Sequence, residues 1–151
     1  MNKNVIKPVI LILMVSVASG FLFNLISNDR IPFIYRPIEI KAGMELDHEQ
    51  TYRLLREGRA LFIDTRYEKD FHPAHISGAV NIPGNLPRDE LTTRLKQISK
   101  DTIILIYCSS SSCPSARRLA GFMTYLGYEN VALYPAGFEE WLQFNYPVEK
   151  D

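Results

Sequence analysis

The sequence has few of the residues from which metal centres and nucleic-acid surfaces are built. Its 151 residues include three histidines and two cysteines, and both cysteines, Cys108 and Cys113, lie in one short segment. Two cysteines with no histidine nearby in sequence do not match the usual pattern of a zinc site. The 17 basic and 17 acidic residues cancel, so the chain lacks the basic excess of a nucleic-acid-binding domain. We therefore expect no metal, no organic cofactor and no nucleic-acid partner.

Charged residues are also missing from a long stretch near the N-terminus. Residues 8–28 contain none, and at about 1.5 Å per residue this stretch covers a bilayer core of about 30 Å. Because Lys3 and Lys7 precede it, we predict an uncleaved transmembrane signal anchor over residues 1–28. Two alternatives stay open: a cleaved signal peptide, with the small residues 18–20 near the cut, and a buried helix of a soluble protein.

The basic residues on the two sides of this stretch are nearly balanced. Lys3 and Lys7 come before it, and Arg30, Arg36 and Lys41 follow it, so the positive-inside rule gives only a weak preference. A short N-terminal tail usually stays in the cytoplasm. We therefore expect the remainder of the chain to face outward, which in a bacterium places it on the periplasmic side of the inner membrane.

The chain after the anchor divides into a linker and one domain. Residues 29–44 contain two prolines and show no clean period, so they are interpreted as a linker, and residues 45–151 as a single domain. A helix is predicted to begin near Asp47, which can act as its N-cap. Gln50, three residues later, completes the pattern of a capping box.

Short apolar runs alternate with helical patterns along this domain. We predict strands at 60–64, 102–107 and 131–134, and helices at 47–58, 115–126 and 138–144. The run at 102–107 is typical of a strand that is covered on both faces. Alternation of strands and helices predicts an α/β fold, with a mostly parallel sheet and helices on both of its faces.

Cys108 follows the most apolar of these strands and begins a loop that leads into a helix, in the segment IYCSSSSCPSARRLA at 106–120. In open α/β sheets, ligands bind beyond the carboxyl ends of strands. The N–H groups of such a loop and helix stabilise a thiolate or a bound anion. We predict that Cys108 is catalytic; the alternative is an inert buried cysteine. The predicted substrate-binding loop comprises Ser109, Ser110, Ser111, Ser112, Cys113 and Ser115.

Three segments, taken in order, resemble the rhodanese (sulfurtransferase) superfamily over roughly residues 46–149. They are FIDTR at 62–66, FHPAHISGAVNIPG at 71–84, and the cysteine loop followed by YENVALYPAGFEEW at 128–141. The resemblance implies a rhodanese-like parallel sheet of about five strands flanked by helices. It also implies a sulfurtransferase in which Cys108 takes a sulfane sulfur as a persulfide from a small sulfur-containing anion, such as thiosulfate, or from a persulfide, and passes it to a thiol.

The loop departs from this family at one position. Many members carry an arginine five residues after the cysteine, where this chain has Cys113. Without that guanidinium, strong turnover of thiosulfate is not expected, and neither is a phosphatase role, because phosphate needs a bidentate arginine. Two further functions stay open: a thiol–disulfide redox protein that uses Cys108 with Cys113 as its partner, and a non-catalytic binding module.

Other notable residues are interpreted as structural. His75 is expected to make a structural hydrogen bond, and Arg66 is expected to pair with Glu68 or Asp70. Phe138 and Trp141 are expected to close the core. Arg117 and Arg118 are expected to lie on the solvated surface.

Overall fold

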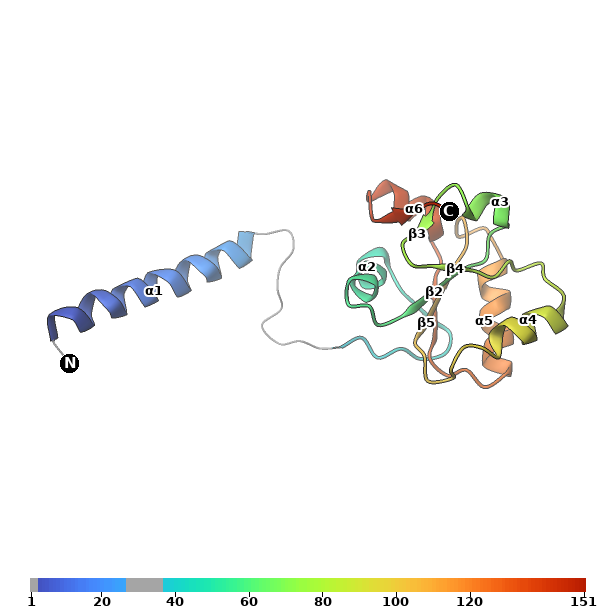
Figure 1. Cartoon of the computed structure of the whole chain (residues 1–151), viewed down its shortest axis with the longest axis horizontal. Helices are drawn as coiled ribbons and strands as arrows, with labels where there is room; N and C mark the ends of the chain where they lie inside the picture. The colour runs from blue at the N-terminus through green and yellow to red at the C-terminus, as the bar shows by residue number, and fades with distance from the viewer. Residues whose placement is uncertain (1–2, 27–36) are drawn as a thin grey trace. The chain divides into compact units, whose positions relative to one another are not determined.

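A computed structural model of the chain describes residues 3–26 and 37–151 (Figure 1). The chain divides into two units, Met1–Pro37 and Ile38–Asp151. In the first unit, helix α1 (Lys3–Ile26) contains the segment Ile6–Ile26, which is long and apolar enough to cross a membrane. The most apolar stretch of this segment contains no buried residue. Such a helix can be a membrane anchor or a signal sequence.

The second unit alternates strands and helices along the chain, much as the sequence predicts. Its elements are β1 (Met44–Glu45), α2 (His48–Arg56), β2 (Leu61–Asp64), α3 (Glu68–Phe71), β3 (His75–Ile76), β4 (Val80–Asn81), α4 (Arg88–Leu95), β5 (Ile104–Tyr107), α5 (Ser115–Tyr125), β6 (Val131–Tyr134), α6 (Gly137–Gln143) and β7 (Val148–Glu149).

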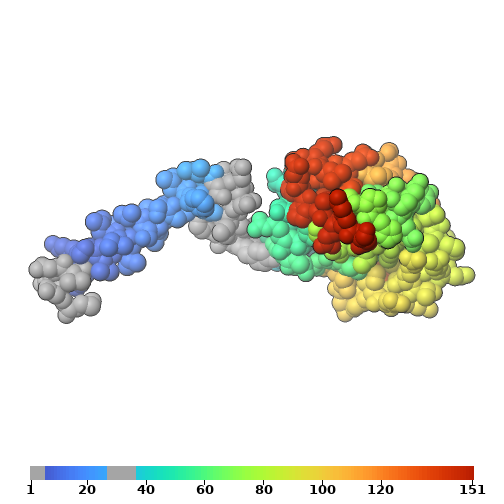
Figure 2. Space-filling model, turned by 45° about the horizontal axis from the view of Figure 1, so that its top comes forward, coloured from blue at the N-terminus to red at the C-terminus, as the bar shows by residue number. Residues whose placement is uncertain are grey.

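Five of these strands form one sheet in the order β1-β6-β5-β2-β4, and all of its neighbouring pairs are parallel. The predicted α/β fold with about five parallel strands is therefore confirmed. A second pair was not predicted: β3 runs antiparallel to β7. Figure 2 shows the C-terminal segment, in red, against the green surface of the segment that contains β3. Each of these strands has only two residues, too few for a detectable alternation.

The side chains of β5 alternate between two apolar clusters, one on each face of the sheet. Ile104 and Ile106 belong to the cluster that includes residues of α4 and α5, and Leu105 and Tyr107 to the cluster with residues of α2 and α6. Figure 1 shows α2 on one side of the strands and α4 and α5 on the other. Cys108 continues the alternation and lies in the α4–α5 cluster. The predicted helices on both faces are thus confirmed.

The predicted capping box of α2 is present. An oxygen of Asp47 accepts a hydrogen bond from the N–H of Gln50 at 2.8 Å, and the side-chain oxygen of Gln50 accepts one from the N–H of Asp47 at 3.2 Å. The strand predicted at 102–107 begins later, at Ile104, while Trp141 and Phe138 are buried in the α2–α6 cluster as expected.

Part of the predicted linker packs on the domain. Ile40 is buried in the α2–α6 cluster, and Met44 belongs to β1, which pairs with β6. Residues 29–36 of that linker lie outside the described residues. The other end of the segment therefore contributes to the core and to the sheet, because Ile40 is buried and β1 forms the edge strand next to β6. The division into anchor, linker and domain stays a prediction.

Candidate active site

Two chain segments leave the carboxyl ends of the neighbouring strands β2 and β5, where Asp64 lies opposite Tyr107. The first segment is a tight corner, residues 64–66. The Asp64 side chain is fully buried and accepts hydrogen bonds from Nε of Arg66 at 2.9 Å and from its terminal nitrogen at 2.7 Å. The same carboxylate accepts the backbone N–H of Arg66 at 2.8 Å. This buried ion pair fixes the corner.

Neighbouring elements hold the same corner from outside. The Asn81 side chain donates to the carbonyl oxygens of Asp64 and Arg66, both at 3.0 Å. Thr65 donates its N–H and its hydroxyl to the carbonyl of Tyr107, at 3.0 and 2.9 Å. The Arg66 guanidinium lies over the ring of Phe138, with its carbon 4.0 Å from the ring centre. The expected pairing of Arg66 with Glu68 or Asp70 is wrong, because Asp64 is closer and is buried.

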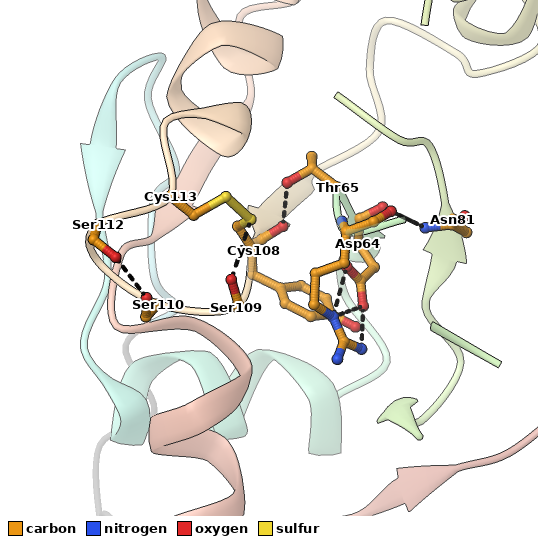
Figure 3. The surroundings of a disulfide bond; sticks show 10 residues. Asp64, Thr65, Asn81, Cys108, Ser109, Ser110, Ser112 and Cys113 are labelled. Carbon is orange, nitrogen blue, oxygen red and sulfur yellow. Dashed lines mark hydrogen bonds and ion pairs between the residues drawn. A yellow bond between two sulfur atoms is a disulfide. The ribbon is translucent and has the colours of Figure 1, made fainter. Parts of the chain in front are cut away.

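The second segment is the loop after β5, which begins at Cys108. Here Cys108 is 4% exposed and forms a disulfide with Cys113, and the two Cα atoms are 6.1 Å apart (Figure 3). That separation lies in the ordinary range for disulfides. A turn brings the two residues together, since the N–H of Cys113 donates to the carbonyl of Ser110 at 3.1 Å. The Ser109 hydroxyl lies 3.8 Å from the Cys108 sulfur, and the hydroxyls of Ser110 and Ser112 are 3.0 Å apart.

The loop differs from the corner in its backbone donors. Within the described part of the chain, the N–H groups of residues 109–112 have no acceptor. The N-cap position of α5, Pro114, supplies no side-chain acceptor either, so the first turn of that helix also keeps unpaired N–H groups. Unpaired donors beside a helix N-terminus form a surface that attracts negative charge.

Helix α6 holds the loop from the other side through its first residues. The N–H of Phe138 donates to the carbonyl of Cys108, and that of Glu139 to the carbonyl of Ser109, both at 2.9 Å. Gly137 makes this approach feasible. Its φ is +72°, and a Cβ there would lie 2.5 Å from the Cys108 carbonyl oxygen. A glycine is therefore required where α6 meets the loop.

A cavity of about 430 Å³ opens beside the disulfide. It is lined by Arg66, Tyr67, Asp70, Cys108, Ser109, Cys113, Phe138 and Glu139. The ion pair with Asp64 neutralises its one arginine, while Asp70 and Glu139 are exposed. The cavity wall therefore carries a negative excess, which disfavours doubly charged anions relative to neutral or cationic molecules.

The predicted site residues are distributed unequally around this cavity. Cys108, Ser109 and Cys113 line it. Ser110 and Ser111 line a much smaller space on the other side of the loop. The Ser115 side chain fills the room beside Gly84, where an added Cβ would come within 2.5 Å of the serine Cβ. Ser112 lines neither space.

Sequence reasoning missed the residues that other segments bring to the cavity. The sequence predicts structural roles for Arg66 and Phe138 and indicates no place in the site for Asp70 and Glu139, although all four line the cavity. The available signals were the Asp-x-Arg that ends β2 and the Gly-x-x-x-Trp of residues 137–141, which fix the corner and the start of α6. Neither pattern shows that the two segments meet.

Two buried side chains, those of Tyr107 and His75, make hydrogen bonds to the segment that contains α3 and β3. Burial, with a further contribution from the Asp64 carboxylate, raises the pKa of Tyr107 far above its usual value. Its hydroxyl oxygen accepts the N–H of Ile76 at 3.1 Å. The structural hydrogen bond expected of His75 is present, since its Nδ1 donates to the carbonyl of Phe71 at 3.1 Å. Arg118 is exposed as expected, and Arg117 pairs on the surface with Glu45.

Comparison with known proteins agrees with this architecture. The rhodanese-like domain profile matches residues 47–144. The chain belongs to the rhodanese-like domain family. The thiosulfate sulfurtransferase GlpE of Tolumonas auensis is 32% identical over 93 residues, which are 62% of this chain and 82% of that protein.

Other rhodanese-like proteins match over the same domain. The tRNA uridine(34) hydroxylase of Photorhabdus laumondii is 28% identical over 104 residues, 67% of this chain and 29% of that enzyme. The crystal structure of the BH2092 protein from Bacillus halodurans superposes with a TM-score of 0.64 and 27% identity, and covers 72% of this chain and 77% of that one. The rhodanese-like domain thus occurs both in small proteins and as one part of larger enzymes.

Proposed function

We propose that this chain is a membrane-anchored sulfurtransferase in which Cys108 carries a sulfane sulfur atom as a persulfide. Family membership and the similarity to a thiosulfate sulfurtransferase support the class of reaction. The observation on which the proposal rests is the position of Cys108 at the carboxyl end of β5, beside a cavity and a loop with four unpaired N–H groups. Such donors stabilise a thiolate or a persulfide anion.

The reaction starts from the reduced loop, so the disulfide first takes two electrons and two protons from a thiol reductant. The Cys108 thiolate then attacks the outer sulfur of a donor. The sulfur–sulfur bond of the donor breaks, and its electron pair leaves with a thiolate, or with sulfite when the donor is thiosulfate. An acceptor thiolate next attacks the outer sulfur of the Cys108 persulfide, and Cys108 leaves as a thiolate.

The charges around the cavity favour persulfide donors over thiosulfate. Thiosulfate carries two negative charges, and the lining carboxylates of Asp70 and Glu139 repel it, while Arg66 is already paired with Asp64. The loop itself contains no arginine. Low-molecular-weight or protein persulfides bring less charge to the reacting sulfur.

The test uses the full chain in detergent micelles, with Cys113→Ser as the reporter because it leaves Cys108 as the one thiol. After reduction and removal of reductant, the protein is incubated with a cysteine persulfide or with thiosulfate, and its intact mass is measured. We expect a gain of one sulfur atom, about 32 Da. The gain should be absent when Cys108 is also serine. A Cys113→Ser protein that folds but gains no sulfur from either donor would overturn the proposal.

We further propose that α1 anchors the protein with its domain on the periplasmic face of a bacterial inner membrane. The support is the length and apolar character of Ile6–Ile26 and the short basic tail before it. The substitution Tyr125→Cys, in a variant with serine at both native cysteines, tests the orientation. Tyr125 is suitable because it is 84% exposed. The introduced thiol should react with a membrane-impermeant maleimide in intact spheroplasts; labelling only after lysis would reverse the assigned orientation.

A second function, thiol–disulfide exchange, is favoured by one specific observation, the bond between Cys108 and Cys113. In that reaction the disulfide oxidises two thiols of a partner and is itself reduced to two thiols. Its signature combines two results. Mild oxidation of the wild-type chain causes a reversible loss of two hydrogens, about 2 Da, and the Cys113→Ser reporter gains no sulfur. If a folded protein shows neither mass change, the result points to a binding module instead.

A further inference from the structure

The two cysteines of the loop share one cavity and are close enough to bond to each other. We infer that Cys113 is a second reacting thiol, which releases the sulfur carried by Cys108 as hydrogen sulfide. The inference rests on the proposed function, since it requires Cys108 to accept a sulfur first. It gives the protein a further activity, the reduction of a sulfane sulfur to sulfide without a separate thiol acceptor.

The step is an internal displacement. The Cys108 persulfide anion first takes a proton from water, and the Cys113 thiolate then attacks Sγ of Cys108. The bond between that Sγ and the outer sulfur breaks, and its electron pair leaves as hydrosulfide, HS⁻. A disulfide between Cys108 and Cys113 forms at the same time. Two electrons thus pass from the cysteine sulfurs to the sulfane sulfur, and a dithiol reductant must return two electrons before another cycle.

The bond formed in this step is the one that the structure contains. Contacts on both sides hold the two residues in place for it. The Cys108 carbonyl is fixed by the N–H of Phe138 at 2.9 Å, and the N–H of Cys113 is fixed by the Ser110 carbonyl at 3.1 Å. These backbone contacts do not involve the cysteine sulfurs, so reduction of the disulfide removes none of them directly. The reacting thiol therefore stays beside its target at a high effective concentration.

The surroundings favour release of the product over its return. The carboxylates of Asp70 and Glu139 line the cavity, and its arginine is already paired with Asp64. The loop N–H groups stabilise the HS⁻ ion while it forms, and the two carboxylates, with no free cation among the lining residues, repel it as it leaves through the cavity.

A purely structural disulfide is a poor explanation of the same bond. The cysteines are separated by only five positions, so the bond restricts the unfolded chain less than a bond that closes a longer loop. The elements at its two ends are already joined, because residues of β5 and α5 pack in one core cluster. Both cysteines also line an open cavity, where a reductant can reach them.

The experiment follows sulfide release by the reduced full chain in detergent micelles, with a cysteine persulfide as donor and no other thiol. We expect a burst of one sulfide per wild-type chain, because the disulfide cannot accept another sulfur. The protein mass should then lie about 2 Da below that of the dithiol form. Cys113→Ser should instead retain the extra 32 Da or so, and release sulfide at least about 100-fold more slowly.

The matched control is Cys113→Ser combined with Tyr125→Cys, which moves the second thiol to the exposed last residue of α5. It should behave like Cys113→Ser, and the wild-type burst rate should not depend on protein concentration. Background release is taken from Cys108→Ser.

Each outcome separates the two proposals. If Cys113→Ser gains sulfur but the wild type also keeps it and releases no sulfide, the inference fails and the sulfurtransferase stands. If the control with the moved thiol releases sulfide as fast as the wild type, the role of Cys113 fails. If Cys113→Ser gains no sulfur, both proposals fail.

Discussion

The corner after β2 and the loop after β5 leave the same edge of the sheet, yet their polar groups are treated in opposite ways. In the corner, the side chains of Asp64 and Arg66 pair with each other, and the Asn81 side chain donates to the backbone carbonyls of both residues. In the loop, the N–H groups of residues 109–112 have no acceptor among the described residues. Unpaired polar groups are costly when buried, so they persist where water or a ligand can reach them. The corner therefore holds the site in place, while the loop keeps N–H groups available to water or a ligand.

The largest effect is expected from breaking the corner. Arg66→Ala leaves the fully buried Asp64 carboxylate without its cation, which should lower the free energy of unfolding by about 3–5 kcal/mol. Denaturant unfolding of the full chain in micelles, followed by the fluorescence of the one tryptophan, Trp141, measures this loss. Arg117→Ala is the matched control, since its pair with Glu45 is exposed and should contribute at most about 1 kcal/mol. Equal losses in the two variants would show that burial of the pair is not what holds the corner.

A smaller effect is expected where α6 joins the loop. Gly137→Ala introduces a side chain at a φ of +72° and against the Cys108 carbonyl, which should cost about 2–4 kcal/mol. Because the loop must shift, sulfur gain by Cys108 should slow as well. Gly121→Ala, in α5 with nothing within 4 Å, should stabilise by up to about 1 kcal/mol. A Gly137→Ala chain with wild-type stability and sulfur gain would show that the contact does not position the loop.

If the loop binds the sulfur through its backbone N–H groups and not through its serine hydroxyls, removing a hydroxyl should have the smallest effect. Ser110→Ala removes a hydroxyl whose one hydrogen bond among the described residues is with the Ser112 hydroxyl, and it keeps the N–H. Stability should change by less than about 0.5 kcal/mol, and the rate of sulfur gain at Cys108 by less than about threefold. A tenfold or greater fall in that rate would assign the binding role to the serine hydroxyls instead.

Much of the fold was predictable because each element has a local signal. The apolar run of β5 and the capping box of Asp47 and Gln50 depend on residues adjacent in sequence, and both appear as expected. The pair β3–β7 was not predictable, since it joins residues some 70 positions apart through two-residue strands. The partner of Arg66 was predicted wrongly for a related reason. Burial of Asp64 decided the pairing, and burial is a property of the assembled fold.

By itself, the sequence determined the apolar N-terminal helix, the order of strands and helices, and the position of Cys108 at the end of a central strand, because these follow from periodicity and neighbouring residues. Only the tertiary structure decided which side chains share the cavity with Cys108. Asp70 comes from α3 and Glu139 from α6, and no pattern along the chain measures their distance in space. The charge of the cavity, and with it the preference for a donor, therefore depends on how the elements pack around the sheet.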